Sequence, residues 1–440
     1  MLRISQLKLP VEHTEAQLKK KLLKTAHIKE QDLKQFFIRK RSVDGRKKPE
    51  LYYVYTVDLI VANEEHVKKI SKGKLQTVQE KNYHIPEHGA KKLRKRPVVI
   101  GSGPAGLFCA YLLAFEGYEP LVIERGAPVR ERQKVVEQFW KDGILNTASN
   151  VQFGEGGAGT FSDGKLNTLV KDKFGRNRFV LETFVKFGAP EEILWESKPH
   201  IGTDILIEVV ERMREEIIRL GGEFLFHSQV TDILPKENCL IVNGCHRIET
   251  DAAVFAVGHS ARDTFQMLFD RNVAMKSKSF AIGVRAEHRQ DMIDEAMYGR
   301  KERGPLGAAA YKLTAQLENG RGVYTFCMCP GGYVVNASSE QGRLAVNGMS
   351  YHDRAGENAN SAVIVTVTKD DYGSDHPLAG MEFQRRLEKK AWEEGGGNVP
   401  IQRFADFCTG TISVKTGNVT PNINMVSMFM QNQTNVTLKT

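Results

Sequence analysis

Along residues 1–90, alternating apolar and polar positions predict strands, and apolar positions three or four residues apart predict helices. The predicted elements are a strand at Leu2–Leu9, a helix after Thr14, strands at Phe36–Val43 and Leu51–Val61, and a helix at Glu64–Ile70. Thr14, with Gln17 three residues later, has the spacing of a capping box. The pattern therefore predicts a small α+β domain.

The pattern changes after residue 90. The basic stretch 91–97, which ends at Pro97, is typical of a linker. Residues 98–276 alternate apolar runs with helical spacing, as in an α/β domain built on a parallel sheet. Residues 277–380 contain strand patterns and predict an inserted β-rich domain, and residues 381–440 return only in part to the α/β domain. The β-α-β-β-α order of residues 1–90 resembles part of a ferredoxin-like fold.

A glycine-rich turn follows the first apolar strand of the α/β domain. The strand Val98–Ile100 leads into Gly101, Ser102, Gly103, Pro104, Ala105 and Gly106, then a helix over 107–117, a strand over 120–123, and Glu124. Gly101 permits the tight turn, Gly103 lets backbone N–H groups approach a pyrophosphate, and Gly106 lets the helix pack closely on the sheet. Glu124 can accept hydrogen bonds from ribose hydroxyls and would repel a 2′-phosphate, so the turn predicts FAD or NAD rather than NADP.

The segment VVIGSGPAGLFCAYLLAFEGYEPLVIERG, which includes Glu124 and Arg125, resembles the fingerprint of the glutathione-reductase-like flavoproteins, which have two dinucleotide-binding domains. In that superfamily, the position of Val230, here in a strand expected at Glu223–Ile233, contacts the adenine. The apolar strand that ends at Ala256 and Gly258 closes the first FAD-binding portion. The resemblance implies an FAD-binding Rossmann domain with an inserted β-rich substrate domain.

A second glycine cluster, FGEGGAGTFSDGKLNT, occupies residues 153–168. It satisfies G-x-G-x-x-G, but neither an apolar strand precedes it nor an apolar helix follows it, so a second nucleotide-binding fold is disfavoured. The interpretation favoured here is a backbone loop close to the flavin or its pyrophosphate. The residues expected in that contact are Gly156, Gly157, Ala158, Gly159 and Thr160. Lys165 either approaches a phosphate or the flavin, or is simply solvated.

This cluster, together with HIGTD, CMCPGG, NGMS and ENANSA, is similar to motifs of a bacterial family of FAD-dependent dehydrogenases. The resemblance implies an oxidoreductase that acts on a small molecule, with NAD(P)H as a candidate transient electron donor. It continues only to about Asn424, and the last residues, MVSMFMQNQTNVTLKT, do not resemble the expected continuation. The C-terminal end is therefore expected to be truncated or divergent.

The sequence assigns no catalytic residue. Cys327 and Cys329 are two apart on a predicted strand and so expected on one face; packing is favoured over a redox pair because a disulfide fits this spacing poorly. His259, His288 and His352 fall in segments near the expected site, but a lone histidine is more often a surface or satisfied polar residue. No cysteine spacing predicts a zinc site.

The formal charge of +9 is concentrated at the N-terminus. Residues 1–96 hold 24 Lys+Arg and 11 Asp+Glu, a net charge of +13. A solvated basic surface is the favoured explanation, and nucleic acid is the alternative partner. The leading hypothesis is thus an FAD-dependent oxidoreductase, with an RNA-directed flavoprotein and a non-catalytic flavin-binding protein as alternatives. Without an apolar run long enough for a membrane span or signal peptide, a cytoplasmic protein is expected.

Overall fold

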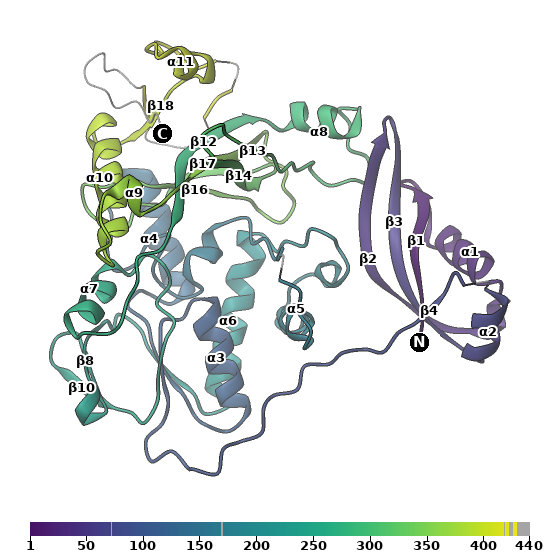
Figure 1. Ribbon diagram of the computed structural model, residues 1–440, viewed down its shortest axis with the longest axis horizontal. Helices are drawn as coiled ribbons and strands as arrows, with labels where there is room; N and C mark the ends of the chain where they lie inside the picture. The colour runs from purple at the N-terminus through teal and green to yellow at the C-terminus, as the bar shows by residue number, and fades with distance from the viewer. Residues whose placement is uncertain (72, 169, 418, 422–425, 429–440) are drawn as a thin grey trace. The chain divides into compact units, whose positions relative to one another are not determined.

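The computed structural model describes residues 1–71, 73–168, 170–417, 419–421 and 426–428 (Figure 1). The chain divides into two compact units. The first unit contains residues 1–88, 165–201 and 290–310, and the second contains residues 89–164, 202–289 and 311–440.

The first unit is built on a four-stranded antiparallel sheet in the order β2-β3-β1-β4. Its strands are β1 (Leu2–Pro10), β2 (Leu33–Lys47), β3 (Glu50–Val61) and β4 (Gln76–Thr77). Its helices are α1 (Glu15–Ala26), α2 (Glu64–Ile70), α5 (Arg176–Lys186) and α8 (Gln290–Tyr298), with short 3-10 turns at η1 (Glu30–Asp32) and η3 (Glu191–Leu194). This strand order is that of a ferredoxin-like sheet.

Local signals in this unit act as the sequence predicts. The backbone N–H of Thr14 donates to Gln17 Oε1 at 2.8 Å, and the N–H of Gln17 donates to Thr14 Oγ1 at 3.3 Å, which confirms the capping box. The apolar face of α1, with Leu18 and Leu22, packs into one core with Val57 and Leu59 of β3.

Two segments join the first unit from a distance in the sequence. The N–H of Arg41 in β2 donates to the carbonyl of Trp195 at 2.7 Å, and the hydroxyl of Tyr53 donates to the carbonyl of Pro305 at 3.0 Å. Residues 165–201 and 290–310 therefore pack with the N-terminal sheet, although the sequence pattern groups them with the FAD-binding and inserted domains.

The second unit holds a four-stranded parallel sheet in the order β11-β5-β6-β7. Its strands are β5 (Val98–Ile100), β6 (Leu121–Ile123), β7 (Glu223–Leu225) and β11 (Ala253–Phe255), and its helices are α3 (Pro104–Phe115), α4 (Val129–Asp142), α6 (Thr203–Arg219) and α7 (Arg262–Asp270). Short parallel strands joined by helices are the arrangement of a Rossmann-like α/β fold.

One predicted strand is wrong. The segment Glu223–Ile233 does not form one strand, because β7 ends at Leu225 and His227 takes a left-handed conformation with φ of 52°. The chain then starts β8 (Val230–Leu234), which belongs to a separate antiparallel sheet. That sheet also contains β9 (Cys239–Val242) and β10 (His246–Glu249), with η4 (Pro235–Glu237) between β8 and β9.

The rest of the second unit is strand-rich. A sheet in the order β12-β17-β14-β13 contains β12 (Phe280–Arg289), β17 (Asn358–Val367), β14 (Gly322–Cys329) and β13 (Thr314–Gln316). A hairpin pairs β15 (Tyr333–Asn336) with β16 (Val346–Met349), followed by α9 (Lys369–Tyr372), α10 (Ala379–Glu394), β18 (Val399–Ile401), α11 (Phe404–Thr409) and β19 (Val426–Met428). Residues 429–440, on which much of the expected C-terminal divergence falls, lie outside the described residues.

Candidate functional site

The turn after β5 requires glycine at two positions. Gly101 has φ of 98°, and a Cβ on it would lie 2.6 Å from the carbonyl oxygen of Ala256. A Cβ on Gly106 would lie 1.8 Å from the carbonyl oxygen of Gly101, so only glycine lets α3 approach the strand this closely. Ala256 thus bounds the turn from the neighbouring strand segment.

The N-terminus of α3 is open to solvent. Gly103 is the N-cap and offers no side chain to the first turn, and Pro104 fills the first helical position without an N–H. Pro104 and Ala105 are exposed. A 12-residue helix with an uncapped, exposed N-terminus favours a bound anion through its dipole and N–H groups.

Glu124, at the end of β6, is buried, and protein donors surround its carboxylate. Its Oε2 accepts the N–H and the hydroxyl of Ser102, both at 2.8 Å, and its Oε1 accepts the N–H groups of Gly126 at 2.9 Å and Gly154 at 3.2 Å. The carboxylate fixes the glycine turn. Its contact with a ribose stays a prediction, and such a contact must share or displace one of these donors.

The second glycine cluster packs directly on the first. The N–H of Gly156 donates to the carbonyl of Ser102 at 2.9 Å. A Cβ on Gly157 would lie 3.0 Å from the Cα of Gly103, so the two loops meet through backbone atoms. The remaining residues singled out in this cluster, Ala158, Gly159 and Thr160, lie in the 3-10 turn η2 (Gly157–Phe161).

Arg132 of α4 organises the second loop, although it is not among the residues that the sequence predicts for the site. Its guanidinium is fully buried and donates to five loop carbonyls, those of Asn150, Val151, Gly154, Glu155 and Gly157. It also lies 4.8 Å from the ring centroid of Phe161. Burial lowers the pKa of Arg132 to about 10, and nearby Glu124 and Glu155 oppose that shift, so the side chain is still a cation at neutral pH.

The sequence pattern of α4 does contain a signal that Arg132 has a buried, structural role. The buried positions of α4 are Val129, Arg132, Val136 and Phe139, spaced three or four residues apart. Arg132 therefore stands on the apolar stripe of an amphipathic helix, where a charged residue needs internal partners.

Glu155 is a second buried ionisable group in the loop. Its Oε2 accepts the N–H of Val129 at 2.7 Å and an N–H of Arg214 at 2.8 Å. Its Oε1 is buried and has no hydrogen-bond partner among the described residues. Burial raises the pKa of Glu155 to about 7, because desolvation outweighs the opposing effects of Arg214 and the Val129 N–H.

Three more residues are predicted to contact FAD, and their surroundings differ. Arg125 forms two hydrogen bonds with Asp263, at 3.0 and 2.8 Å, and lies over the ring of Phe153. Val230 is buried at the start of β8, and Gly258 is exposed with φ of 76°. Their contacts with FAD stay predictions.

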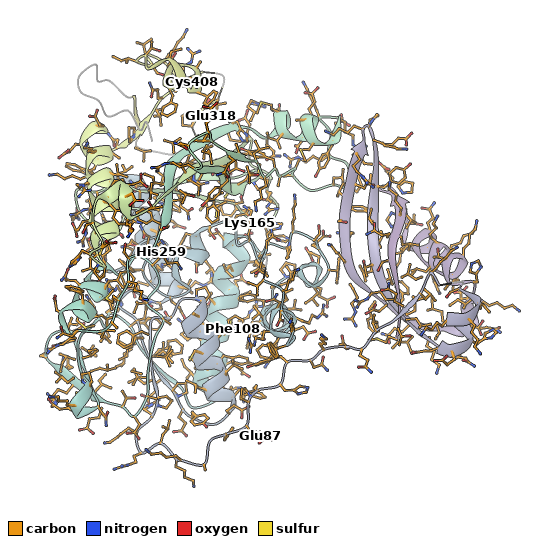
Figure 2. All side chains as sticks on the ribbon, viewed as in Figure 1. Glu87, Phe108, Lys165, His259, Glu318 and Cys408 are labelled. Carbon is orange, nitrogen blue, oxygen red and sulfur yellow. The ribbon has the colours of Figure 1, made fainter. Side chains whose placement is uncertain are left out.

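Lys165 and His259, which the sequence also places near the expected site, are labelled in Figure 2. Lys165 belongs to the first unit, where its backbone forms an isolated bridge with His200, whereas His259 follows the exposed Gly258 of the second unit. Neither placement tests a role toward a cofactor.

Two further family motifs, HIGTD and NGMS, meet at the second loop. The hydroxyl of Thr203 donates to the carbonyl of Ser162 at 2.7 Å, and its N–H donates to the carbonyl of Ser350 at 3.1 Å. Arg354 and Asp163 form a bidentate ion pair in which both side chains are largely buried. The loop after η2, the start of α6 and the segment after β16 are thus held together.

The cysteine prediction needs correction. Cys327 is exposed and has φ of 45°, whereas Cys329 is buried, because a β-bulge lies between Phe326 and Cys329. The bulge breaks the alternation of side chains, so the two thiols do not share one face. The Cys329 thiol instead donates to the carbonyl of Cys327.

The histidines differ in setting. His288 lies 2.8 Å from the hydroxyl of Tyr311 through Nε2, and burial lowers its pKa. The N–H of His352 donates to Asp204. Within the described ranges, no group of three His, Cys, Asp or Glu residues could hold a metal ion, and no helix is long and apolar enough to cross a membrane.

Family models of known proteins match separate parts of this chain. Residues 279–437 match the family model of an FAD-dependent protein, C-terminal domain-like, which extends past Asn424, where the sequence resemblance was expected to end. Residues 99–129 match an NAD(P)-binding Rossmann-like domain, and residues 1–60 match a domain of unknown function.

Similar solved structures include OTEMO in an FAD-bound form, which is 16% identical over 38% of this chain and 26% of that chain, with a TM-score of 0.23. Halogenase PltM is 10% identical over 67% of this chain and 56% of that chain, with a TM-score of 0.31. These scores are too low to add to the assignment.

The relative that decides the family is an uncharacterized protein of Clostridium beijerinckii, 48% identical over 433 residues. The alignment covers 96% of this chain and 80% of that protein. The chain therefore belongs to the same family as the Clostridium protein, a family of FAD-dependent proteins with a Rossmann-like nucleotide-binding domain.

Proposed function

We propose that the protein is an FAD-dependent oxidoreductase that acts on a small molecule, with its FAD domain arranged as in the glutathione-reductase-like flavoproteins. The observation that carries this proposal is the joining of two glycine loops through Ser102, Glu124 and Gly156 at the open N-terminus of α3. This backbone-lined surface fits the ADP half of FAD, because both loops meet without side chains and the helix end favours a pyrophosphate.

The residues that would hold FAD belong to three groups. The turn and helix start (Gly101–Gly106) would receive the pyrophosphate, Glu124 the ribose, and the second loop (Gly156–Thr160) the flavin side. FAD, when bound, supplies the electron transfer of the reaction. The protein's own contribution is to bind and orient the cofactor: Arg132 holds the second loop through its carbonyls, and Glu124 holds the turn through its N–H donors.

The β-rich sheets are the proposed source of the substrate-binding wall. The ion pair between Arg354 and Asp163 and the hydrogen bonds of Thr203 support this, since they tie the segment after β16 to the second glycine loop. In the described chain, the parallel β11-β5-β6-β7 sheet is the Rossmann-like sheet, and no second one accompanies it. NAD(P)H is therefore proposed as a transient donor that binds without its own Rossmann domain.

The visible spectrum of the purified full chain tests the first part of this proposal. A bound flavin, or uptake of added FAD with a shifted flavin spectrum, is expected. If neither appears, the proposal is wrong. Anaerobic titration with NADH and NADPH tests the second part: reduction of the flavin is expected, whereas a flavin that neither donor nor any candidate substrate reduces would point to a non-catalytic flavin-binding protein.

A further inference from the structure

The basic residues of the first unit fall into two groups that differ in their ion pairs. Three basic side chains of β1 and β2 are neutralised by ion pairs. Arg3 forms two hydrogen bonds with Asp58, at 2.6 and 2.8 Å, Arg39 contacts the same carboxylate at 2.8 Å, and Lys8 pairs with Asp44 at 2.7 Å. These three side chains therefore contribute little to the surplus charge of the N-terminal region, whereas Lys34, Lys40 and Lys47 of β2 are exposed and form no ion pair within the described ranges.

The helices of the same unit carry lysines without such partners. These residues, the basic helix face, are exposed and form no ion pair within the described ranges: Lys20, Lys21 and Lys24 of α1, and Lys68 and Lys69 of α2. Glu64 of α2 contacts the N-terminal amine, which leaves Glu65 of α2 and Glu15 at the start of α1 as the exposed acids of the two helices. The basic helix face thus holds an unneutralised positive charge.

Both helices cover the same side of the sheet (Figure 1). Leu22 of α1 and Val67 of α2 belong to one buried core with Val57 and Leu59 of β3. Because the apolar sides of the two helices face this common core, their lysines project outward on the same layer of the unit.

We propose that the basic helix face binds the phosphate backbone of a nucleic-acid duplex. Lys20 and Lys24 are one helical turn apart, about 6 Å along the axis, which allows several lysines to contact one backbone. Neither helix contains Phe, Tyr or Trp, and the single exposed ring is that of His66, so the surface offers no row of aromatic side chains for stacking successive bases. It also lacks exposed large apolar side chains, which disfavours insertion into a lipid surface.

The test measures binding of the full chain to a fluorescent 20-base-pair DNA duplex by anisotropy at several salt concentrations. If all five lysines contact phosphates, log Kd should rise with log salt with a slope on the order of 4 to 5. The triple substitution Lys20→Gln, Lys21→Gln and Lys24→Gln should lower that slope by about 3 and weaken binding at least tenfold at low salt.

A matched variant controls for net charge. Lys34, Lys40 and Lys47 are exposed residues of β2 and belong to neither α1 nor α2, and their substitution by Gln removes the same charge. This control should bind like the wild type. Circular dichroism and flavin content of each variant show that the fold is retained, and they report on the flavin proposal separately from duplex binding.

Three results would overturn the proposal. The first is absence of duplex binding at 50 mM salt, and the second is equal weakening by the control variant. The third is equal or tighter binding, through the same lysines, to phosphatidylserine vesicles, which would identify an anionic membrane surface instead.

Discussion

The backbone N–H and the hydroxyl of Ser102 both donate to one carboxylate oxygen of Glu124, at 2.8 Å each. The other oxygen accepts the N–H groups of Gly126 and Gly154. An ionised carboxylate has about four acceptor positions, so this buried side chain uses its capacity to join the glycine turn, the end of β6 and the second loop. Glu124 is thus a structural residue of the site, whatever it contributes to the ribose.

Glu124→Gln should destabilise the protein even without FAD. The new amide NH₂ group would face two donors that it cannot satisfy, whereas Ser102→Ala removes only a hydroxyl. We expect the free energy of unfolding to fall by about 2–4 kcal/mol for Glu124→Gln and by about 1 kcal/mol for Ser102→Ala. Urea unfolding of the flavin-free variants measures both values, and wild-type stability of Glu124→Gln would contradict the role assigned to its carboxylate.

Gly103→Ala and Gly106→Ala should separate ligand approach from folding. A Cβ on Gly106 meets the Gly101 carbonyl at 1.8 Å, so this variant should be strongly destabilised. Gly103 has φ of −69°, and its nearest obstacle is the Cα of Gly157 at 3.7 Å, an ordinary contact distance. Gly103→Ala should therefore fold normally but bind FAD at least tenfold more weakly, as measured by fluorescence titration.

Each of these two glycine variants has an outcome that would contradict its assigned role. Normal FAD affinity in a folded Gly103→Ala protein would show that the pyrophosphate does not approach this residue. Normal stability of Gly106→Ala would show that α3 and β5 are less tightly packed than the structure describes.

Local signals allowed the sequence to predict much of this fold. Val98–Ile100 is a strand because it is a continuous apolar run ended by glycine, and Thr14 with Gln17 caps α1 through contacts three residues apart. The broken segment at His227 was missed, because periodicity does not show where a chain leaves one sheet for another. Arg132 was missed for a similar reason, since its partners lie 18 to 25 residues away.

Arg132→Lys tests the role of that buried guanidinium. A lysine has three donors in place of five and lacks the planar fork, so at least two of the five loop carbonyls would lose their partner. We expect a loss of about 2–5 kcal/mol in the free energy of unfolding and weaker FAD binding. Arg130→Lys is the matched control, because Arg130 is half-exposed on the same helix and pairs with Glu211 at its surface.

Flavin titration and denaturant unfolding together decide the outcome. Both substitutions keep the positive charge, so equal effects of the two would show that the contacts of Arg132 with the loop carbonyls are not what stabilises the site. A stable Arg132→Lys protein with reduced FAD affinity would still support the role of Arg132 in shaping the loop.

Glu155 should make stability depend on pH in a direction opposite to that of most carboxylates. Its pKa is raised to about 7 in the folded protein, against about 4.3 for an unfolded glutamate. Between these values the folded state retains a proton that the unfolded state has lost. The stabilisation is therefore fully present below about pH 4.3 and is lost as the pH rises through 7.

The size of the effect follows from the shift. A difference of between two and three pKa units corresponds to about 3 kcal/mol. Glu155→Gln keeps the shape of the side chain and removes its titration, so the variant's stability relative to wild type should increase by about that amount from pH 4.3 to pH 8. Other titrating groups are common to both proteins and cancel in this comparison. A pH-independent difference would mean that the pairing with Arg214, at 2.8 Å, outweighs burial and keeps Glu155 ionised.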